Sequence, residues 1–143
     1  MHTRVTSDII DPQTVLGMVG SPADGAAILF IGSVREHNDG RAVNGMRYDA
    51  YLEMAEPVLR DIVAEAAVRA GSERIAVVHR IGELAVGTVS VAIAVSTPHR
   101  EESFDAARYI IEQIKQRLPV WKHEHYNDGE PRWLAGAIPP ESG

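Results

Sequence analysis

The stretch from Ile114 to Glu124, IKQRLPVWKHE, constrains the fold more than any other, because a helix has to end inside it. Before Pro119, apolar residues recur every three or four positions, which is the spacing of one face of a helix. They are Phe104, Ala107, Ile111, Ile114 and Leu118. Pro119 stops this helix, since proline lacks a backbone N–H and its ring clashes with the preceding turn. The chain therefore turns at Pro119 from a helix into an extended segment.

The two lysines beside this corner form the first candidate site. Lys115 follows Ile114 on the last turn of the helix and Lys122 follows Trp121 on the extended segment, so both amines are held close to apolar surface. Two amines about 5 Å apart repel by roughly 3 kcal/mol at an effective dielectric constant of about 20. That repulsion favours the neutral form of one amine, which can act as a base or a nucleophile while the other stays charged and holds an anion. The alternative is a pair of ordinary solvated lysines.

Two other helices are predicted from their capping residues. One spans residues 12 to 20 with Asp11 as its N-cap, and the other spans residues 56–70 with Gly71 at its C-terminus. Strands are predicted where apolar and β-branched residues dominate. They cover residues 4–9, 26–34, 44–51, 74–81 and 88–97, with a last pair inside residues 120–137.

Hairpins connect several of these strands. Residues 74–81 and 88–97 are joined by a turn that contains Gly82 and Gly87, and the last pair turns at residues 127–129. No repeat or linker divides residues 1–143, so one domain is expected. Single helices between strands, together with these hairpins, predict an α+β domain with three main helices and largely antiparallel sheets.

Charge and cysteine content exclude several classes of function. Asp and Glu number 20 against 14 Lys and Arg, for a formal net charge of −6, so general attraction to nucleic acid or to an anionic membrane is not expected. The absence of cysteine excludes disulfides, thiolate metal sites and a sulfur-carrying thiol on this chain. The N-terminal segment lacks the apolar core of a signal peptide, and no apolar run reaches ~20 residues. A cytoplasmic protein is expected.

Two basic groups are candidates for binding an anion. Arg35 opens a polar stretch, REHN, directly after the buried strand at residues 26–34, and loops held by rigid strands commonly bind ligands. His99 and Arg100 lie at the start of the third helix, where free backbone N–H groups and the helix dipole attract anions. The alternatives are a solvated loop at Arg35, and a helix capped by Thr97 with Arg100 paired to a neighbouring glutamate.

The HEH segment is a third, weaker candidate. Alternation along a strand places His123 and His125 on one face, which is compatible with a metal-dependent hydrolase that also uses Glu124. The sequence offers no third ligand at a diagnostic spacing, so no metal is expected. The GSVREHNDG segment lacks the glycine spacing and the GK pair of a nucleotide-binding loop.

Six ordered segments between Phe30 and Trp133 carry a family resemblance. They are FIGSVREHNDGRAV, YDAYLEMA, HRIGELAVG, STPHREESFDA, KQRLPVWKHE and a closing RW. In this order and spacing, they make the chain resemble the catalytic, larger subunit of molybdopterin synthase. The resemblance implies the α/β hammerhead fold of that subunit. It also implies a homodimer that binds one small partner at each end, giving a heterotetramer.

The resemblance further implies a reaction. The family inserts two dithiolene sulfurs into cyclic pyranopterin monophosphate and opens its cyclic phosphate, a step of molybdenum cofactor biosynthesis that needs no resident cofactor or metal. The sulfur arrives as a thiocarboxylate on the C-terminal glycine of a small ubiquitin-like partner whose sequence ends in Gly-Gly. A sulfur-transferring chain without cysteine has to receive its sulfur from another molecule.

Matched residue by residue, the active-site lysines of the family correspond to Lys115 and Lys122. Its anion-binding residues correspond to Arg35, His99 and Arg100. Lys115 is expected to lie nearest the thiocarboxylate as a neutral amine, while Lys122 is expected to stay charged and steady the substrate.

The sequence departs from the family in its tail. Members of the family can contribute a basic residue from the tail of the neighbouring subunit, but the residues after Trp133, LAGAIPPESG, contain none. Either Arg132 substitutes for that residue or the contact is missing. The alternative function is a non-catalytic scaffold of the same fold that binds anions.

Overall fold

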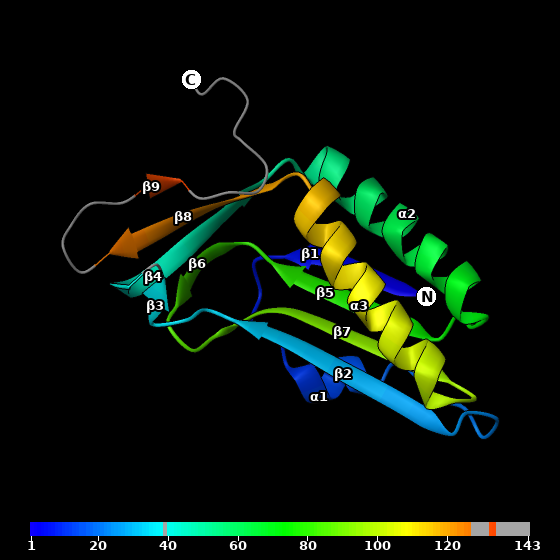
Figure 1. Ribbon diagram of the computed structural model, residues 1–143. Coiled ribbons are helices and arrows are strands. Elements are labelled where there is room, and N and C mark those ends of the chain that lie inside the picture. The colour runs from blue at the N-terminus through cyan, green and yellow to red at the C-terminus, as the bar shows by residue number, and fades with distance from the viewer. Residues whose placement is uncertain (39, 127–131, 134–143) are drawn as a thin grey trace.

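The computed structural model describes residues 1–38, 40–126 and 132–133, and within them the chain forms two sheets and three helices (Figure 1). The helices are α1 (Pro12–Leu16), α2 (Leu52–Ala70) and α3 (Arg100–Arg117). The strands are β1 (His2–Thr6), β2 (Ala26–Ser33), β3 (His37–Asn38), β4 (Arg41–Ala50), β5 (Ile75–Arg80), β6 (Gly82–Ala85), β7 (Val89–Thr97), β8 (Val120–Tyr126) and β9 (Arg132–Trp133). None of the described helices is long and apolar enough to cross a membrane.

The first sheet has four strands in the order β1-β5-β7-β2. β5 and β7 pair antiparallel, with Val77 opposite Ile93, which confirms the predicted antiparallel pairing of these segments. The predicted direct turn between them is wrong, because the strand β6 lies there. β2 lies antiparallel beside β7, whereas β1 pairs with β5 in parallel. Since β1–β5 is the one parallel pair among the described strands, the prediction of an α+β fold with largely antiparallel sheets is confirmed.

The second sheet joins β3, β4, β8 and β9 in that order, and β6 also pairs with β4. β8 pairs with β9, so the strands of the predicted last hairpin are present, while its turn at residues 127–129 lies outside the described residues. β6 was not predicted. It begins at Gly82, whose positive φ of 91° lets the chain leave the first sheet sharply and join the second. The two sheets are thus connected through a glycine turn.

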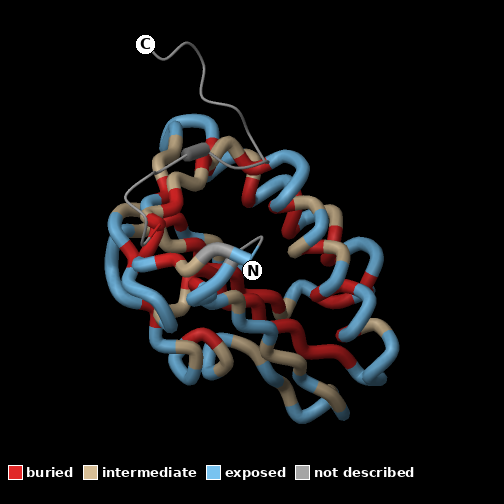
Figure 2. The backbone as a smooth tube through the Cα atoms, turned by 60° about the vertical axis from the view of Figure 1, so that its left-hand side comes forward, coloured by how far each residue is buried: buried red, intermediate tan, exposed pale blue. Residues whose placement is uncertain are grey.

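Two helices cover one face of the first sheet, and α1 covers the other (Figure 1). Leu59 and Ile62 from α2 and Ile110 from α3 are fully buried in one cluster with Ile75 and Ile93 of the sheet. Figure 2 shows this buried layer running through the molecule beneath largely exposed helix surfaces. Each such side chain contributes roughly 1.5–3 kcal/mol through burial, so this layer fixes where α3 ends relative to the sheet.

The apolar stripe predicted for α3 coincides only in part with its buried face. Ile114 is buried as predicted, yet Phe104 is 57% exposed, and Ser103 and Ala106 are buried in its place. Ser103 turns inward because its hydroxyl hydrogen-bonds with the hydroxyl of Thr97 at the end of β7. The spacing of apolar residues alone does not reveal such a polar contact.

Several boundaries also differ from the prediction. α2 begins at Leu52 rather than at residue 56, because backbone hydrogen bonds to the Tyr51 carbonyl close its first turn. Pro57 therefore lies inside the helix, where it removes one helical hydrogen bond instead of marking the start. The first strand and the first helix end earlier than predicted, at Thr6 and Leu16.

Candidate functional site

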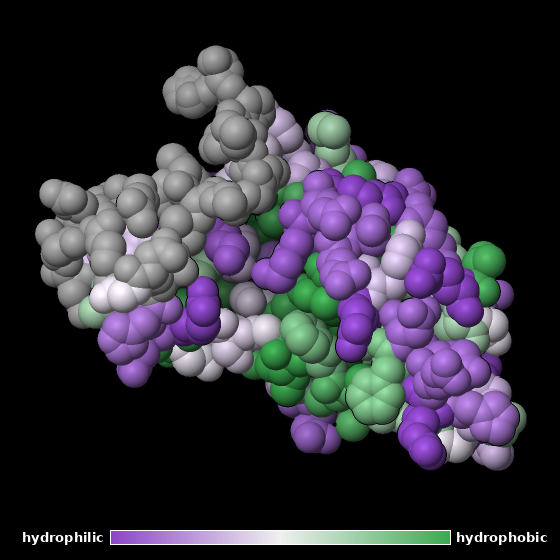
Figure 3. Space-filling model, viewed as in Figure 1, coloured by the Kyte–Doolittle hydropathy of each residue, from purple (hydrophilic) through white to green (hydrophobic). Residues whose placement is uncertain are grey.

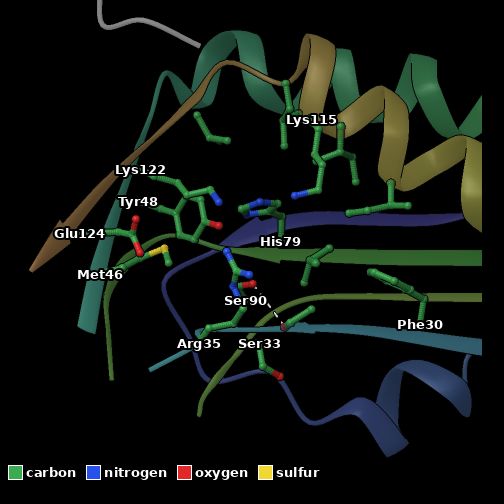
Figure 4. A pocket seen from close by; sticks show the side chains of 16 residues that line it. Phe30, Ser33, Arg35, Met46, Tyr48, His79, Ser90, Lys115, Lys122 and Glu124 are labelled. Carbon is green, nitrogen blue, oxygen red and sulfur yellow. Dashed lines mark hydrogen bonds between the residues drawn. The ribbon is translucent and has the colours of Figure 1, made fainter. Parts of the chain in front are cut away.

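A cavity of about 610 Å³ lies between the C-terminal end of α3, the first sheet, and the strands β4 and β8 (Figure 4). Its polar lining comes from both sheets and from α3. These residues are Ser33, Arg35, Tyr48, His79, Ser90, Lys115, Lys122 and Glu124. The rest of the wall is mostly apolar. The cavity therefore presents a charged side and an apolar side to one ligand.

The corner at Pro119 brings the two lysines into this cavity. α3 ends at Arg117, and its C-cap Leu118 already has an extended backbone, at φ −71° and ψ 124°, while the N–H of Leu118 still closes the last turn. β8 then starts at once and pairs with β4, with Lys122 opposite Tyr48. Lys115 comes from the last turn of the helix, and both lysines line the same cavity (Figure 4). The catalytic roles of these lysines remain predictions.

The electrostatics of the two lysines differ from the sequence-based expectation of a neutral Lys115 and a charged Lys122. Burial lowers the pKa of the Lys122 amine, and the nearby charge of Lys115 lowers it further. Glu124 acts in the opposite direction, and Arg35 adds a smaller lowering. Lys115 is exposed at the rim, whereas Lys122 is half-buried. Lys115 was expected from the sequence to favour the neutral form, but burial favours that form at Lys122.

His79 on β5 is a cavity residue that was not predicted from the sequence. Its side chain is 4% exposed, and Nδ1 lies 2.9 Å from the carbonyl oxygen of Arg80. Burial lowers the pKa of this imidazole to about 4, and the charges of Lys115 and Lys122 add to that effect against the hydrogen bond to Arg80. The available signal was a histidine directly after the apolar run IAVV, within a predicted strand.

Tyr48 and Ser90 form a fixed wall beside His79. The rings of Tyr48 and His79 meet edge to face with centroids 5.1 Å apart. Burial raises the pKa of Tyr48 to about 12, and a hydrogen bond with the Ser90 hydroxyl opposes this shift. The Ser90 hydroxyl in turn donates to the carbonyl of Gly32 at 3.2 Å. Tyr48 is therefore neutral and fixed by its contacts with Ser90 and His79, and it does not act as a base.

Glu124 faces the cavity, while its histidine neighbours do not line it. Glu124 is 3% exposed, and the hydroxyl of Tyr126 donates to it at 3.3 Å. His125 instead contacts Glu83 on β6 at 3.1 Å. Strand alternation thus places Glu124 on the opposite face of β8 from the two histidines. Within the described residues, no three side chains of metal-ligating type form a group that could hold a metal ion. A hydrolase centre built from these three residues is not supported.

The apolar wall occupies the side of the cavity beneath α3. It includes Phe30 from β2, Val91 from β7 and Ile111 from α3. Phe30 is 37% exposed, although its strand lies in the first sheet. Figure 3 shows hydrophobic side chains gathered in the hollow beside α3, next to hydrophilic ones. Such a surface suits a ligand with a flat apolar ring and an anionic group.

His99 and Arg100 lie at the other end of α3. His99 is the N-cap and Arg100 is the first residue of the helix, so roughly 22 Å of helix axis separates Arg100 from Lys115. Both side chains are exposed, and no ion pair within the described residues involves Arg100. Thr97 is not the cap, since its hydroxyl donates to the His99 carbonyl. One chain therefore places three of the five predicted residues in the cavity and leaves these two outside it.

Known proteins share this sequence and fold. A family model described as MoaE protein matches residues 5–117. The molybdopterin synthase catalytic subunit of Halalkalibacterium halodurans is 48% identical over 126 residues, which cover 88% of this chain and 80% of the relative. Among solved structures, molybdopterin synthase from Staphylococcus aureus superimposes with a TM-score of 0.86 at 34% identity, covering 92% of this chain and 95% of that chain.

A more distant structure shares the fold alone. It is a chain in a complex of subunits 1 and 2 of the molybdopterin-converting factor from Helicobacter pylori, with a TM-score of 0.66 and 18% identity. The match covers 92% of this chain and 88% of that chain. The resemblance inferred from the six sequence segments is confirmed by the family model and by the more similar relatives. This chain belongs to the MoaE family of molybdopterin synthase catalytic subunits.

Proposed function

We propose that this chain transfers sulfur to cyclic pyranopterin monophosphate from the C-terminal thiocarboxylate of a small ubiquitin-like partner. The cavity carries this proposal, because it gathers Arg35, Lys115 and Lys122 beside an apolar wall in a chain that has no cysteine. Cations suit the phosphate and the thiocarboxylate, and the apolar wall suits the ring system. Without a thiol of its own, the chain has to receive sulfur on another molecule.

Lys115 is the amine that meets the partner's tail. It is exposed at the rim of the cavity, where an entering chain end arrives first. The thiocarboxylate sulfur bonds to a substrate carbon as a carbon–oxygen bond at that carbon breaks and the oxygen leaves. The Lys115 nitrogen, after losing a proton, then attacks the acyl carbon, and the bond between the acyl carbon and sulfur breaks. Sulfur then stays on the substrate, and the acyl group is held on nitrogen until water releases it.

Lys122 and Arg35 act on the substrate's phosphate. Arg35 is suited to hold it, because a guanidinium binds phosphate through two parallel hydrogen bonds. Lys122 lies deeper in the cavity, half-buried on β8. In its charged form it stabilises the negative charge that develops on the oxygen that leaves when the cyclic phosphate opens.

His99 and Arg100 fit this scheme only in an assembly. Because they lie roughly 22 Å from Lys115 along α3, they can reach a bound phosphate only in the cavity of another copy. A homodimer supplies such a copy, and β2 is an edge strand with Phe30 and Ile31 partly exposed, at 37% and 42%. One partner subunit per cavity completes a heterotetramer, in keeping with the two-subunit complex in which this fold occurs.

A single-turnover assay tests the proposed function. The chain is mixed with thiocarboxylated partner and cyclic pyranopterin monophosphate, and the product is followed by fluorescence after oxidation. We expect dithiolene product at a rate that depends on both reactants. Calorimetric titration of the same pterin phosphate runs in parallel, and binding without any turnover would instead establish the non-catalytic scaffold.

A further inference from the structure

His79 presents one nitrogen to the protein and the other to the cavity. A carbonyl oxygen only accepts hydrogen bonds, so the 2.9 Å contact with Arg80 requires a proton on Nδ1. In the neutral ring, Nε2 is then an acceptor with a free lone pair. None of the hydrogen bonds between described residues involves Nε2, although the side chain is only 4% exposed and lines the cavity.

The groups around this ring are mostly cations. Figure 4 shows the imidazole between the amino ends of Lys115 from α3 and Lys122 from β8. Arg35 and Glu124 are the other charged residues of the cavity, and Tyr48 packs edge-on against the ring. In the sheet, His79 lies between uncharged neighbours on β1 and β7. An unused acceptor is thus surrounded by hydrogen-bond donors.

We propose that His79 is a positioning residue, whose Nε2 accepts a hydrogen bond from the amine of Lys115 and so holds that amine inside the cavity. The inference deepens the proposed function, on which its kinetic consequence depends. One N–H of the amine is used by Nε2, and the nitrogen lone pair is left for the acyl carbon. When the amine attacks, the same hydrogen bond stabilises the positive charge that develops on the Lys115 nitrogen.

Lys115 needs such an acceptor more than Lys122 does. Lys122 is half-buried on a paired strand, whereas Lys115 is exposed on the last turn of α3 and can swing into solvent. The charge of Lys115 also acts on His79 more strongly than that of Lys122. A carboxylate at this position would stabilise the protonated amine, which has no lone pair, whereas a neutral imidazole orients the amine without adding charge.

Two substitutions separate this role from a structural one. In His79→Gln the amide occupies the position of Nε2 and can accept from Lys115, whereas in His79→Asn it occupies the position of Nδ1 and reaches only Arg80. We expect the single-turnover rate of His79→Asn to fall roughly 10- to 100-fold, the range for losing a hydrogen bond to a charged group, with His79→Gln much closer to the wild-type rate. His2→Gln removes an exposed histidine and serves as the control. Equal rates in the two His79 variants, or a faster Asn variant, would overturn the proposal.

A nuclear magnetic resonance measurement tests the contact without turnover. With the ring nitrogens labelled by ¹⁵N, we expect Nδ1 to be protonated and Nε2 to be bare near pH 7, and the Nε2 shift to move in Lys115→Ala. A protonated Nε2, or an Nε2 shift that does not respond to Lys115→Ala, refutes the contact even if the enzyme is active. If the contact is present and the chain makes no product, the failure belongs to the proposed function. Circular dichroism establishes that each variant is folded.

Discussion

His79 makes the stability of the folded chain depend on pH in a defined window. Its pKa falls from 6.5 to about 4 in the fold, first because of burial and then because of the charges of Lys115 and Lys122. Between these two values the unfolded chain binds a proton that the folded chain does not, so the free energy of unfolding falls as the pH falls. This contribution is fully present above pH 6.5 and is lost on acidification to about pH 4.

The size of this effect is set by the same two values. Each pH unit inside the window is worth about 1.4 kcal/mol. Acidification from pH 7.5 to 4.5 should therefore lower the free energy of unfolding by about 2–3 kcal/mol through His79 alone. Domains of this kind are commonly stable by about 5–15 kcal/mol, so the loss is a large fraction of the total.

Urea denaturation of the wild type and of His79→Gln measures this contribution. Both proteins are unfolded at one protein concentration at several pH values, since an oligomer's stability depends on concentration. Asp24 and Glu65, whose pKa values are lowered by Arg74 and Arg117, also titrate on acidification, but they do so in both proteins. We expect the wild type to lose about 2–3 kcal/mol more than the variant. Parallel curves would refute the neutral, buried state of His79.

Other variants test the cavity residues. Lys115→Ala should leave the fold and partner binding nearly intact but remove most product in the single-turnover assay, and Lys115→Arg should not restore it, because a guanidinium does not deprotonate. Lys122→Arg should retain more activity than Lys122→Ala because it keeps a cation in the cavity; equal losses would mean that the neutral amine favoured by burial is what the reaction needs. Arg35→Ala should weaken binding of the pterin phosphate by about 1.5–3 kcal/mol in calorimetric titration, and unchanged affinity would remove Arg35 from the phosphate site.

Local signals in the sequence predicted the elements that build the cavity. Pro119 and the periodicity before it placed the end of α3 and the start of β8, because a proline acts within one turn of its own position. The same residue type gave a wrong start for α2, since Pro57 lies inside that helix and not in its first turn. Proline determines the end of a preceding helix more strictly than it determines the first residue of the next one.

Long-range pairing accounts for the features that the sequence did not reveal. The parallel partner of β1 and the crossing of β6 to the second sheet depend on segments distant in sequence, and no local pattern specifies them. His79 was overlooked for a related reason. Within one apolar strand it looks like a core residue, and only the packing of α3 and β8 over β5 turns its position into a cavity wall. The basic residues were identified from the sequence, but the distances between them could not be predicted from it.

The distance of His99 and Arg100 from the lysines leads to a prediction about the assembly. If both residues serve the cavity of a second copy, a chain lacking them still supplies Lys115, Lys122 and Arg35 to its own cavity. A chain carrying Lys115→Ala still supplies His99 and Arg100 to its neighbour. A heterodimer of the two variants then contains one complete site and one site that lacks both contributions.

Co-expression with two different affinity tags provides this heterodimer. One parent homodimer carries His99→Ala together with Arg100→Ala, and the other carries Lys115→Ala. Both parents should be nearly inactive. The heterodimer should recover about half of the wild-type rate per dimer, because one of its two sites is complete. Native mass spectrometry verifies that the purified species contains one chain of each kind. An inactive heterodimer of verified composition would show that the two basic residues do not act across the dimer, and their distance from Lys115 within one chain would then exclude them from the phosphate site altogether.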